Sequence, residues 1–147
     1  MTLVQPVAAV PSQSGARRAA RLAAVQTLYQ QEYGQELKTG LHLDEGHVVA
    51  APDGVLMDKI VQTVTARRAD IDEILGKSLD PAWPVARLEL VLRAILRAGT
   101  GEILENPQTP TAFLITDYVD VAHAFFAGKE PGLVNAVLDK IAKLVRG

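Results

Sequence analysis

The chain has 147 residues, of which 48% are hydrophobic, and its 15 basic and 17 acidic side chains give a formal net charge of −2. This length and composition allow a sizeable buried core, which excludes disorder throughout the chain, and the lack of cysteine excludes disulfides and thiolate metal sites. Because no apolar run approaches the roughly 20 residues that cross a bilayer and residues 1–15 lack the features of an export signal, we expect a cytoplasmic protein without membrane contact.

The first elements in chain order are a tail, a helix and a loop. Residues 1–15 are rich in Pro, Ser, Gln and Ala, which predicts a flexible tail before a folded domain over residues 16–147. A helical pattern runs from Ala16 to Tyr33 and ends at Gly34. We expect residues 35–52 to form a loop with at most one short helix. This loop holds metal-ligand types, but a solvated polar loop is the simpler interpretation of His42, Asp44, Glu45 and His47.

Two helical segments follow, each marked by apolar residues at helical spacing. Asp53 is a candidate N-cap for a helix with an apolar face of Leu56, Ile60, Val64, Ile71 and Leu75. Arg67 and Arg68 interrupt this face, so we expect a bend or break there. The next helix is expected to open after Trp83 with Pro84 in its first turn. It should end near residues 99–101 or continue to Glu105.

The last two helices have clear apolar stripes. Thr109 and Pro110 resemble a cap and a first helical position, and the expected buried face comprises Ala112, Ile115, Val119, Ala122 and Phe126. A turn at residues 128–132 leads to a final helix with Leu133, Val134, Val137, Leu138, Ile141 and Val145 on its apolar side. No segment alternates with period two for long enough to predict a strand, so the fold class is all-α, with five or six helices.

No pattern typical of an enzyme is present. A phosphate loop, a nucleophile elbow and a zincin motif are all missing, so we expect no catalytic residue, no metal and no cofactor. Gly99-Thr100-Gly101 gives half of a dinucleotide-binding pattern, but it follows a helix, and a helix-ending turn is the preferred interpretation. His123 lies off the apolar stripe and is interpreted as a surface residue.

The arginines at the start of the first helix are the most informative residues. Residues 1–31 contain three basic side chains and no acidic one, and Arg17, Arg18 and Arg21 share an arc of about 100° on the helix. Core-type residues continue the same side, so we expect the first turn to project positive charge beyond the core. Guanidinium groups suit phosphates, and Gln26 and Tyr29 could contact bases, which together favour single-stranded RNA. A solvated basic face is the alternative.

Three segments resemble the NusB family of transcription antitermination factors. Residues 17–21 (RRAAR) with 24–30 (AVQTLYQ) resemble its opening helix, residues 88–97 (LELVLRAILR) its central helix, and residues 134–140 (VNAVLDK) its closing VNGVLD signature. The resemblance covers residues 16–146. It implies a compact domain of two packed three-helix subdomains.

The resemblance also implies partners and a function without catalysis. Family members bind boxA-type single-stranded RNA of ribosomal RNA transcripts together with the ribosomal protein NusE, and they join the elongating RNA polymerase. Carried over, the RNA-binding residues are Arg17, Arg18 and Arg21, with Gln26 and Tyr29 as weaker candidates. In the family, NusE docks on the fourth and fifth helices. The expected partner-binding residues lie on the outer side of the fourth helix and are Leu92, Arg93 and Arg97. A homodimer is a further possibility.

Several positions depart from the family pattern, and they bear on affinity. Ala19 stands where relatives often have another Arg, Leu92 replaces an acid, and Gly132-Leu133 replaces Lys-Phe. Two alternative functions remain open. One is the NusB-like domain of a ribosomal RNA cytosine methyltransferase, which the end of the chain at Gly147 without a methyl-donor site disfavours. The other is a helical adaptor that binds proteins alone.

Overall fold

The computed structural model describes residues 13–34 and 53–147. These residues form six α-helices and one short 3-10 helix without any strand, which confirms the all-α prediction. The elements are α2 (Gln13–Tyr33), α3 (Gly54–Ala66), α4 (Arg68–Ser78), η1 (Val85–Arg87), α5 (Leu90–Glu105), α6 (Thr111–Phe125) and α7 (Glu130–Arg146). The predicted loop over residues 35–52, with its two histidines, and residues 1–12 of the predicted tail lie outside the described residues. The boundary predicted at residue 16 is wrong, because α2 already begins at Gln13. No described helix is long and apolar enough to span a membrane.

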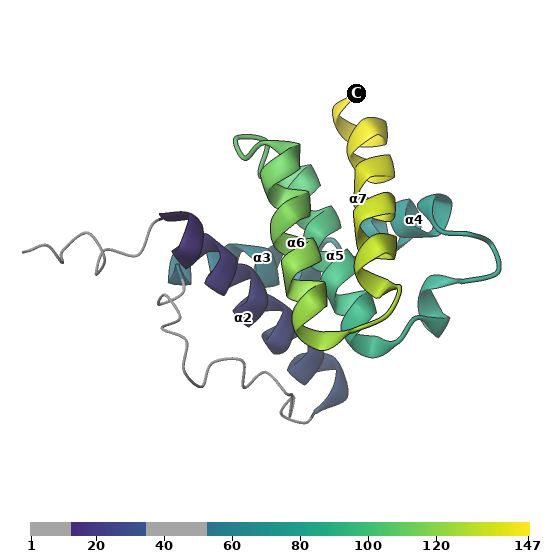
Figure 1. Cartoon of the computed structure of the whole chain (residues 1–147), viewed down its shortest axis with the longest axis horizontal. Helices are drawn as coiled ribbons and strands as arrows, with labels where there is room; N and C mark the ends of the chain where they lie inside the picture. The colour runs from purple at the N-terminus through teal and green to yellow at the C-terminus, as the bar shows by residue number, and fades with distance from the viewer. Residues whose placement is uncertain (1–12, 35–52) are drawn as a thin grey trace, which may run out of the picture.

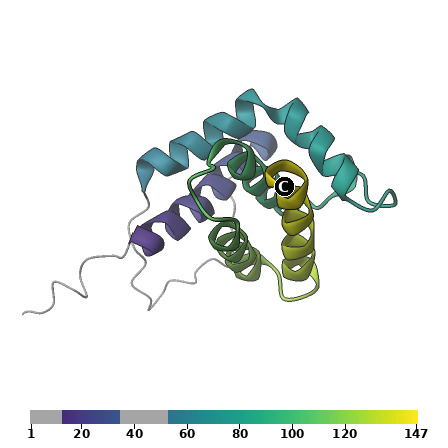
Figure 2. The same cartoon turned by 90° about the horizontal axis from the view of Figure 1, so that it is seen from above.

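Helix α5 is the centre of the fold. It contacts each of the other five α-helices, and every residue from Val91 to Ile103 is buried. Helices α5, α6 and α7 pack against one another side by side, while α2, α3 and α4 surround α5 from the other side (Figure 1). Seen from above, α3 and α4 form a continuous arch along one edge of the molecule (Figure 2). The two three-helix groups that the family resemblance implies, α2–α4 and α5–α7, therefore meet at one buried helix, α5.

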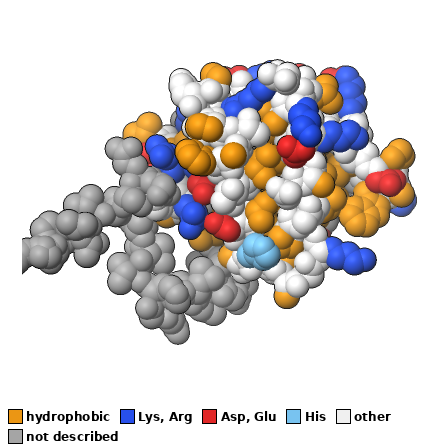
Figure 3. All heavy atoms as spheres, turned by 45° about the horizontal axis from the view of Figure 1, so that its top comes forward, with side chains coloured by type: hydrophobic (Ala, Val, Ile, Leu, Met, Phe, Trp, Pro, Cys, Tyr) orange, Lys and Arg blue, Asp and Glu red, His pale blue; other side chains and the backbone are white. Residues whose placement is uncertain are grey.

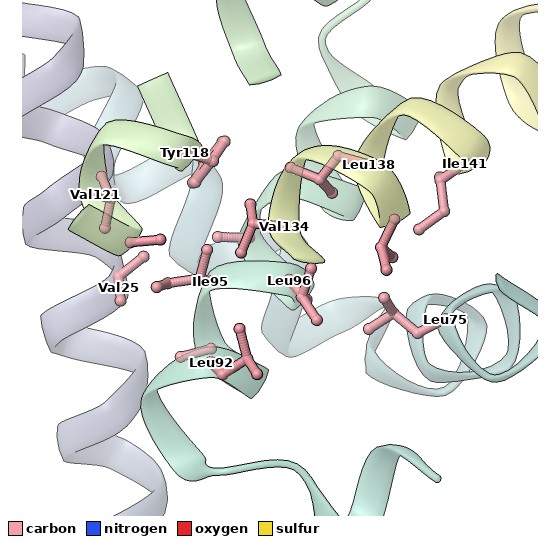
Figure 4. Packing of buried hydrophobic residues seen from close by; sticks show 14 of the residues in the cluster. Val25, Leu75, Leu92, Ile95, Leu96, Tyr118, Val121, Val134, Leu138 and Ile141 are labelled. Carbon is pink, nitrogen blue, oxygen red and sulfur yellow. The ribbon is translucent and has the colours of Figure 1, made fainter. Parts of the chain in front are cut away.

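The core lies where α5 meets its neighbours (Figure 4). Ile95 and Leu96 of α5 are fully buried, together with Val25 of α2 and Leu75 of α4. Most of the apolar stripe expected in the last helix is confirmed, because Val134, Val137, Leu138 and Ile141 are all buried, but Leu133 is only half-buried and Val145 is exposed. Asp139, on the outer side of the same helix, pairs with Lys143.

Local signals placed several helix ends correctly. The backbone of Gly34 has φ of +74°, a conformation that favours glycine, and α2 ends just before it. Asp53 is the N-cap of α3, with its carboxylate accepting a hydrogen bond from the Leu56 N–H at 3.1 Å. The expected break falls at Arg67, whose φ of −118° separates α3 from α4.

The start of the central helix differs from the prediction. Pro84 precedes the 3-10 turn Val85–Arg87, and α5 begins at Leu90, where the Glu89 side chain caps the N–H of Val91. The helix then continues to Glu105, the longer of the two expected ends. The preferred interpretation of Gly99-Thr100-Gly101 as a helix-ending turn is wrong, because all three residues lie inside α5.

The buried face of α6 is also shifted from the prediction. Ala112 is exposed and Val119 and Phe126 are only half-buried, whereas the buried residues are Leu114, Ile115, Asp117, Tyr118, Val121 and Ala122. The shift has a polar cause, because Asp117 and Tyr118 turn inward to meet charged groups of α2 and α5. A stripe judged by apolar residues alone does not register that contribution. His123 is exposed, as expected.

Gly99 allows α5 to approach α7 closely, and this makes a testable contrast with Gly76. A Cβ at Gly99 would lie 2.8 Å from a methyl carbon of Leu138, which is fully buried, whereas a Cβ at Gly76 of α4 would meet nothing within 4 Å. Gly76→Ala should raise the free energy of unfolding by about 0.5–1 kcal/mol through helix propensity. Gly99→Ala should leave the protein at least about 1 kcal/mol less stable than Gly76→Ala, because it overpacks the core. Urea denaturation of both variants measures the difference, and equal stabilities would contradict this account of the α5–α7 contact.

Candidate nucleic-acid interface

A cleft of about 630 Å³ lies between the start of α2 and the start of α6. Its walls combine basic, aromatic and uncharged polar side chains, and its lining comprises Arg17, Arg18, Arg21, Gln108, Thr109, Pro110, Phe113, Thr116 and Asp117. Near the start of α2, the molecular surface shows basic side chains with acidic and hydrophobic ones between them (Figure 3). The three arginines predicted to act together do lie around one site.

Arg21 forms the floor of this cleft and is 1% exposed. Its Nε and Nη2 atoms donate to the two carboxylate oxygens of Glu102 at 2.6 and 2.9 Å, and Nη1 donates to Asp117 at 2.8 Å. The expectation that Arg21 projects beyond the core is therefore wrong. The reason is that two carboxylates, from α5 and α6, draw this guanidinium inward and satisfy its forked donors.

Further hydrogen bonds complete the buried cluster around Glu102. The Tyr118 hydroxyl donates to Glu102 at 2.6 Å, and the Asn106 amide donates to the other carboxylate oxygen at 2.9 Å. Burial raises the pKa of Tyr118 well above its usual value, and the charge of Glu102 adds to the rise. Burial alone would lower the pKa of Arg21, but its hydrogen bonds and charge interaction with Glu102 outweigh this and raise the pKa. Arg21 therefore stays charged.

Arg17 and Arg18 reach the rim of the cleft, one turn before Arg21. Arg18 has a side chain that is 53% exposed, and it lies 3.4 Å from Asp117 and 3.5 Å from Asp120. Arg17 is half-buried and has no carboxylate at ion-pair distance within residues 13–34 and 53–147. These two guanidinium groups are the ones that an incoming phosphate can reach.

The opposite wall of the cleft is held in place from the C-terminal end of the chain. Arg146 donates to the backbone carbonyls of Asn106 and Thr109, each at 2.9 Å, and to the Thr111 hydroxyl at 3.1 Å. These bonds tie α7 to the segment that joins α5 to α6. The first turn of α6 opens at this wall without a side-chain cap, so its N-terminal dipole adds positive potential there.

The sequence reasoning missed Phe113, Gln108 and Thr116, which also line the cleft. Phe113 is 63% exposed although the next two residues of α6 are buried. One signal was available, because a large aromatic side chain lay off the expected apolar stripe of this helix. Gln108 gave no signal, since its position depends on the Arg146 contacts.

Gln26 and Tyr29 do not reach the cleft. Tyr29 is about 16 Å farther along the axis of α2 than Arg18, at 1.5 Å per residue, and its ring lies 5.2 Å from the ring of Tyr33. Partial burial, together with the neighbouring Tyr33 and Glu89, raises the pKa of the Tyr29 hydroxyl. Tyr29 therefore belongs to the other end of α2, close to the segment before α5.

The expected partner-binding residues lie at this second end, but they are buried. Leu92 is 5% exposed and stands among the core side chains (Figure 4). Arg93 donates to Glu32 at 2.7 Å, and Arg97 donates to both oxygens of Asp72 at 2.9 Å. The expectation that these three side chains face outward is therefore wrong, because carboxylates on α2 and α4 hold the arginines in and Leu92 packs into the core.

A smaller hollow of about 280 Å³ nevertheless opens beside them, lined by Ala82, Trp83, Arg87, Leu88, Glu89 and Leu92. Trp83 is 51% exposed at its edge. Arg93 fixes the adjoining turn by donating to the carbonyls of Val85 and Ala86 at 3.4 and 3.2 Å. The cleft and this hollow thus lie at opposite ends of α2. Its described residues hold no cluster of acidic and histidine side chains suited to a metal ion.

Comparison with known proteins gives one consistent family. Residues 18–143 match the NusB family. The chain is 44% identical over 142 residues to the transcription antitermination protein NusB of Rhizobium rhizogenes, covering 89% of this chain and 88% of that protein. It is 40% identical to the NusB of Rhodospirillum rubrum, covering 87% and 83% of the two chains.

Two solved structures share the fold at 26% identity and a TM-score of 0.69. One is T. maritima NusB, which covers 86% of this chain and 90% of its own length. The other contains the antitermination factors NusB and NusE in complex with dsRNA, and covers 88% of this chain and 97% of its own.

The buried role of Arg21 predicts a contrast with Arg17. Arg21→Met leaves Glu102 and Asp117 without their main partner and should cost about 3–5 kcal/mol of stability, because it strands buried carboxylates. Arg17→Met removes the same charge at the rim and should stay within about 0.5 kcal/mol of wild type. Thermal and urea unfolding check both values. A mild effect of Arg21→Met would show that the cluster does not hold α2 in place.

Proposed function

Because this chain belongs to the NusB family, we propose that it is a transcription antitermination factor that binds boxA-type single-stranded RNA of ribosomal RNA transcripts together with NusE. It joins the elongating RNA polymerase in this role and catalyses no reaction. The observation that carries the RNA part of the proposal is the cleft with Arg17 and Arg18 at its rim. The likeness to a structure of NusB and NusE in complex with dsRNA supports RNA and NusE as partners, and the single-stranded form of the RNA is part of this proposal.

The charges around the cleft define how it holds RNA. Two of the three guanidinium groups at the cleft, from Arg18 and Arg21, pair with three carboxylates, from Glu102, Asp117 and Asp120. Arg21 is fully committed to its buried partners. Arg18 is exposed, so a phosphate can take the place of the carboxylates beside it, and Arg17 has a guanidinium available at the rim. We therefore assign about two phosphate contacts to this cleft.

The hollow beside Trp83 is the proposed docking site for NusE. It offers an exposed indole ring next to apolar Leu88 and Leu92, with Arg87 and Glu89 at its edge. An aromatic anchor with a charged rim is the usual composition of a protein-binding hot spot. Arg93 and Arg97 hold the surrounding segments through their ion pairs with Glu32 and Asp72 and are not available to contact the partner directly.

The two alternative functions differ from this proposal in what they require. This chain covers 88% of the length of a related transcription antitermination protein. That coverage favours the leading proposal over a domain of an RNA methyltransferase. A protein-only adaptor would leave the cleft arginines solvated, and its affinity for RNA would be negligible at every salt concentration.

Replacing Arg17 and Arg18 together with Ala tests the RNA site. Affinity for single-stranded boxA-type RNA should fall, and the slope of log K against log salt should decrease by up to about 1.4, at 0.7 for each lost contact with a single strand. Fluorescence anisotropy across a potassium chloride series measures both quantities. Lys77→Ala, an exposed charge on α4, is the matched control and should change neither. An unchanged slope in the double variant would remove this cleft from RNA binding.

Trp83→Ala tests the NusE site independently. We expect the affinity for purified NusE to fall by at least about 1 kcal/mol, because the variant removes the aromatic anchor, while stability and RNA binding by the protein alone stay the same. Calorimetric titration with NusE provides the measurement. Leu92→Lys should destabilise the fold, because it places a charge at a buried position. Full NusE affinity in Trp83→Ala would place the partner elsewhere.

A further inference from the structure

We propose that Phe113 is the stacking platform for one unpaired nucleobase, which sits in the cleft while its flanking phosphates contact Arg17 and Arg18. This inference rests on the proposed RNA-binding function and deepens it, because it says which part of the RNA enters the cleft. The argument depends on the position of Phe113, on the composition of the cleft and on its charge balance.

The position of Phe113 distinguishes it from an ordinary exposed hydrophobic residue. Single apolar side chains on a surface are common and need no explanation. Phe113, however, projects from the first turn of α6 into the lining of a cleft, and that cleft carries guanidinium groups of α2. The ring therefore lies where a ligand held by Arg17 and Arg18 would place its next chemical group.

The remaining lining matches the parts of a nucleotide. The guanidinium groups suit phosphates, the Phe113 ring suits the flat face of a base, and the Gln108 amide and Thr116 hydroxyl can hydrogen-bond to a base edge. The volume of about 630 Å³ falls within the roughly 300–1,000 Å³ that is typical of small-ligand sites. One nucleotide of a flexible strand can thus be accommodated.

The charges around the cleft indicate that base stacking has to contribute to the affinity for RNA. Around the cleft, Arg18 and Arg21 are paired with the carboxylates of Glu102, Asp117 and Asp120, so much of the positive charge that could attract a polyanion is already neutralised. Base–aromatic stacking is uncharged and tolerates many sequences. A site with few free cationic groups but an exposed ring obtains its affinity from the base as well as from the backbone.

The backbone that carries Phe113 is held in place before any ligand arrives. Arg146 donates to Thr109 and Thr111, four and two residues before Phe113, and the following Leu114 and Ile115 are buried in the core. Binding therefore requires no ordering of this backbone, which favours affinity. The ring also selects unpaired bases, since a base inside a duplex already stacks on both neighbours.

Phe113→Ala and Phe113→Trp test this inference with single-stranded boxA-type RNA that carries the fluorescent base 2-aminopurine at one position at a time. Wild type should quench the fluorescence strongly at one position, and the fully duplexed RNA should bind more weakly. Phe113→Ala should bind at least about fivefold more weakly and lose the quenching, with the salt slope unchanged because no charge is removed. Phe113→Trp should retain both the affinity and the quenching.

Tyr33→Ala, which removes an exposed aromatic side chain at the far end of α2, is the matched control and should bind this RNA like wild type. If the wild-type chain binds the RNA and Phe113→Ala keeps full affinity or preserves the quenching, the stacking site is overturned. The proposed function would still stand in that case. Failure of the wild-type chain to bind the RNA at all would overturn both.

Discussion

The buried interaction of Arg21 with Glu102 and Asp117 is the constraint on which the binding cleft depends. It joins α2, α5 and α6 at one point, and Tyr118 and Asn106 complete the hydrogen bonding of Glu102. A guanidinium–carboxylate fork is satisfied at one alignment only, so the cluster sets how far α2 extends past α6. Arg17 and Arg18, one turn earlier, are thereby placed at the surface and not in the core.

This cluster also explains why charges of the same type have different functions within five residues. Arg21 pairs with two carboxylates in the interior and stabilises the fold. Arg18 pairs with its carboxylates at the surface, where solvent weakens the ion pairs. The sequence alone does not distinguish Arg17, Arg18 and Arg21, so each is counted as one available positive charge. The available positive potential at the cleft is therefore smaller than the sequence indicates, and an uncharged contribution from Phe113 becomes more important.

The sequence was sufficient for the fold class and for most of the helices, because the apolar spacing of α3, α4 and α7 reflects direct burial in the core. Local chemistry also placed the Asp53 cap and the end of α2 at Gly34. What the sequence could not provide was the identity of the charged partners. Arg21, Arg93 and Arg97 were assigned to the surface because their carboxylates lie 25 to 96 residues away in the chain. For the same reason Phe113 could not be linked to the arginines of α2.

Both ends of α2 are joined to α5 by ion pairs. At one end Arg21 of α2 meets Glu102 of α5, and at the other Glu32 of α2 meets Arg93 and Arg97 of α5. Apolar contacts alone would tolerate a small slide of α2 along α5, whereas ion pairs about 16 Å apart along the helix axis resist it at both ends. The proposed RNA cleft and the proposed NusE hollow each adjoin one of these clusters. Both surfaces are therefore fixed relative to the same buried helix, which holds the proposed RNA and NusE sites at a set distance from each other.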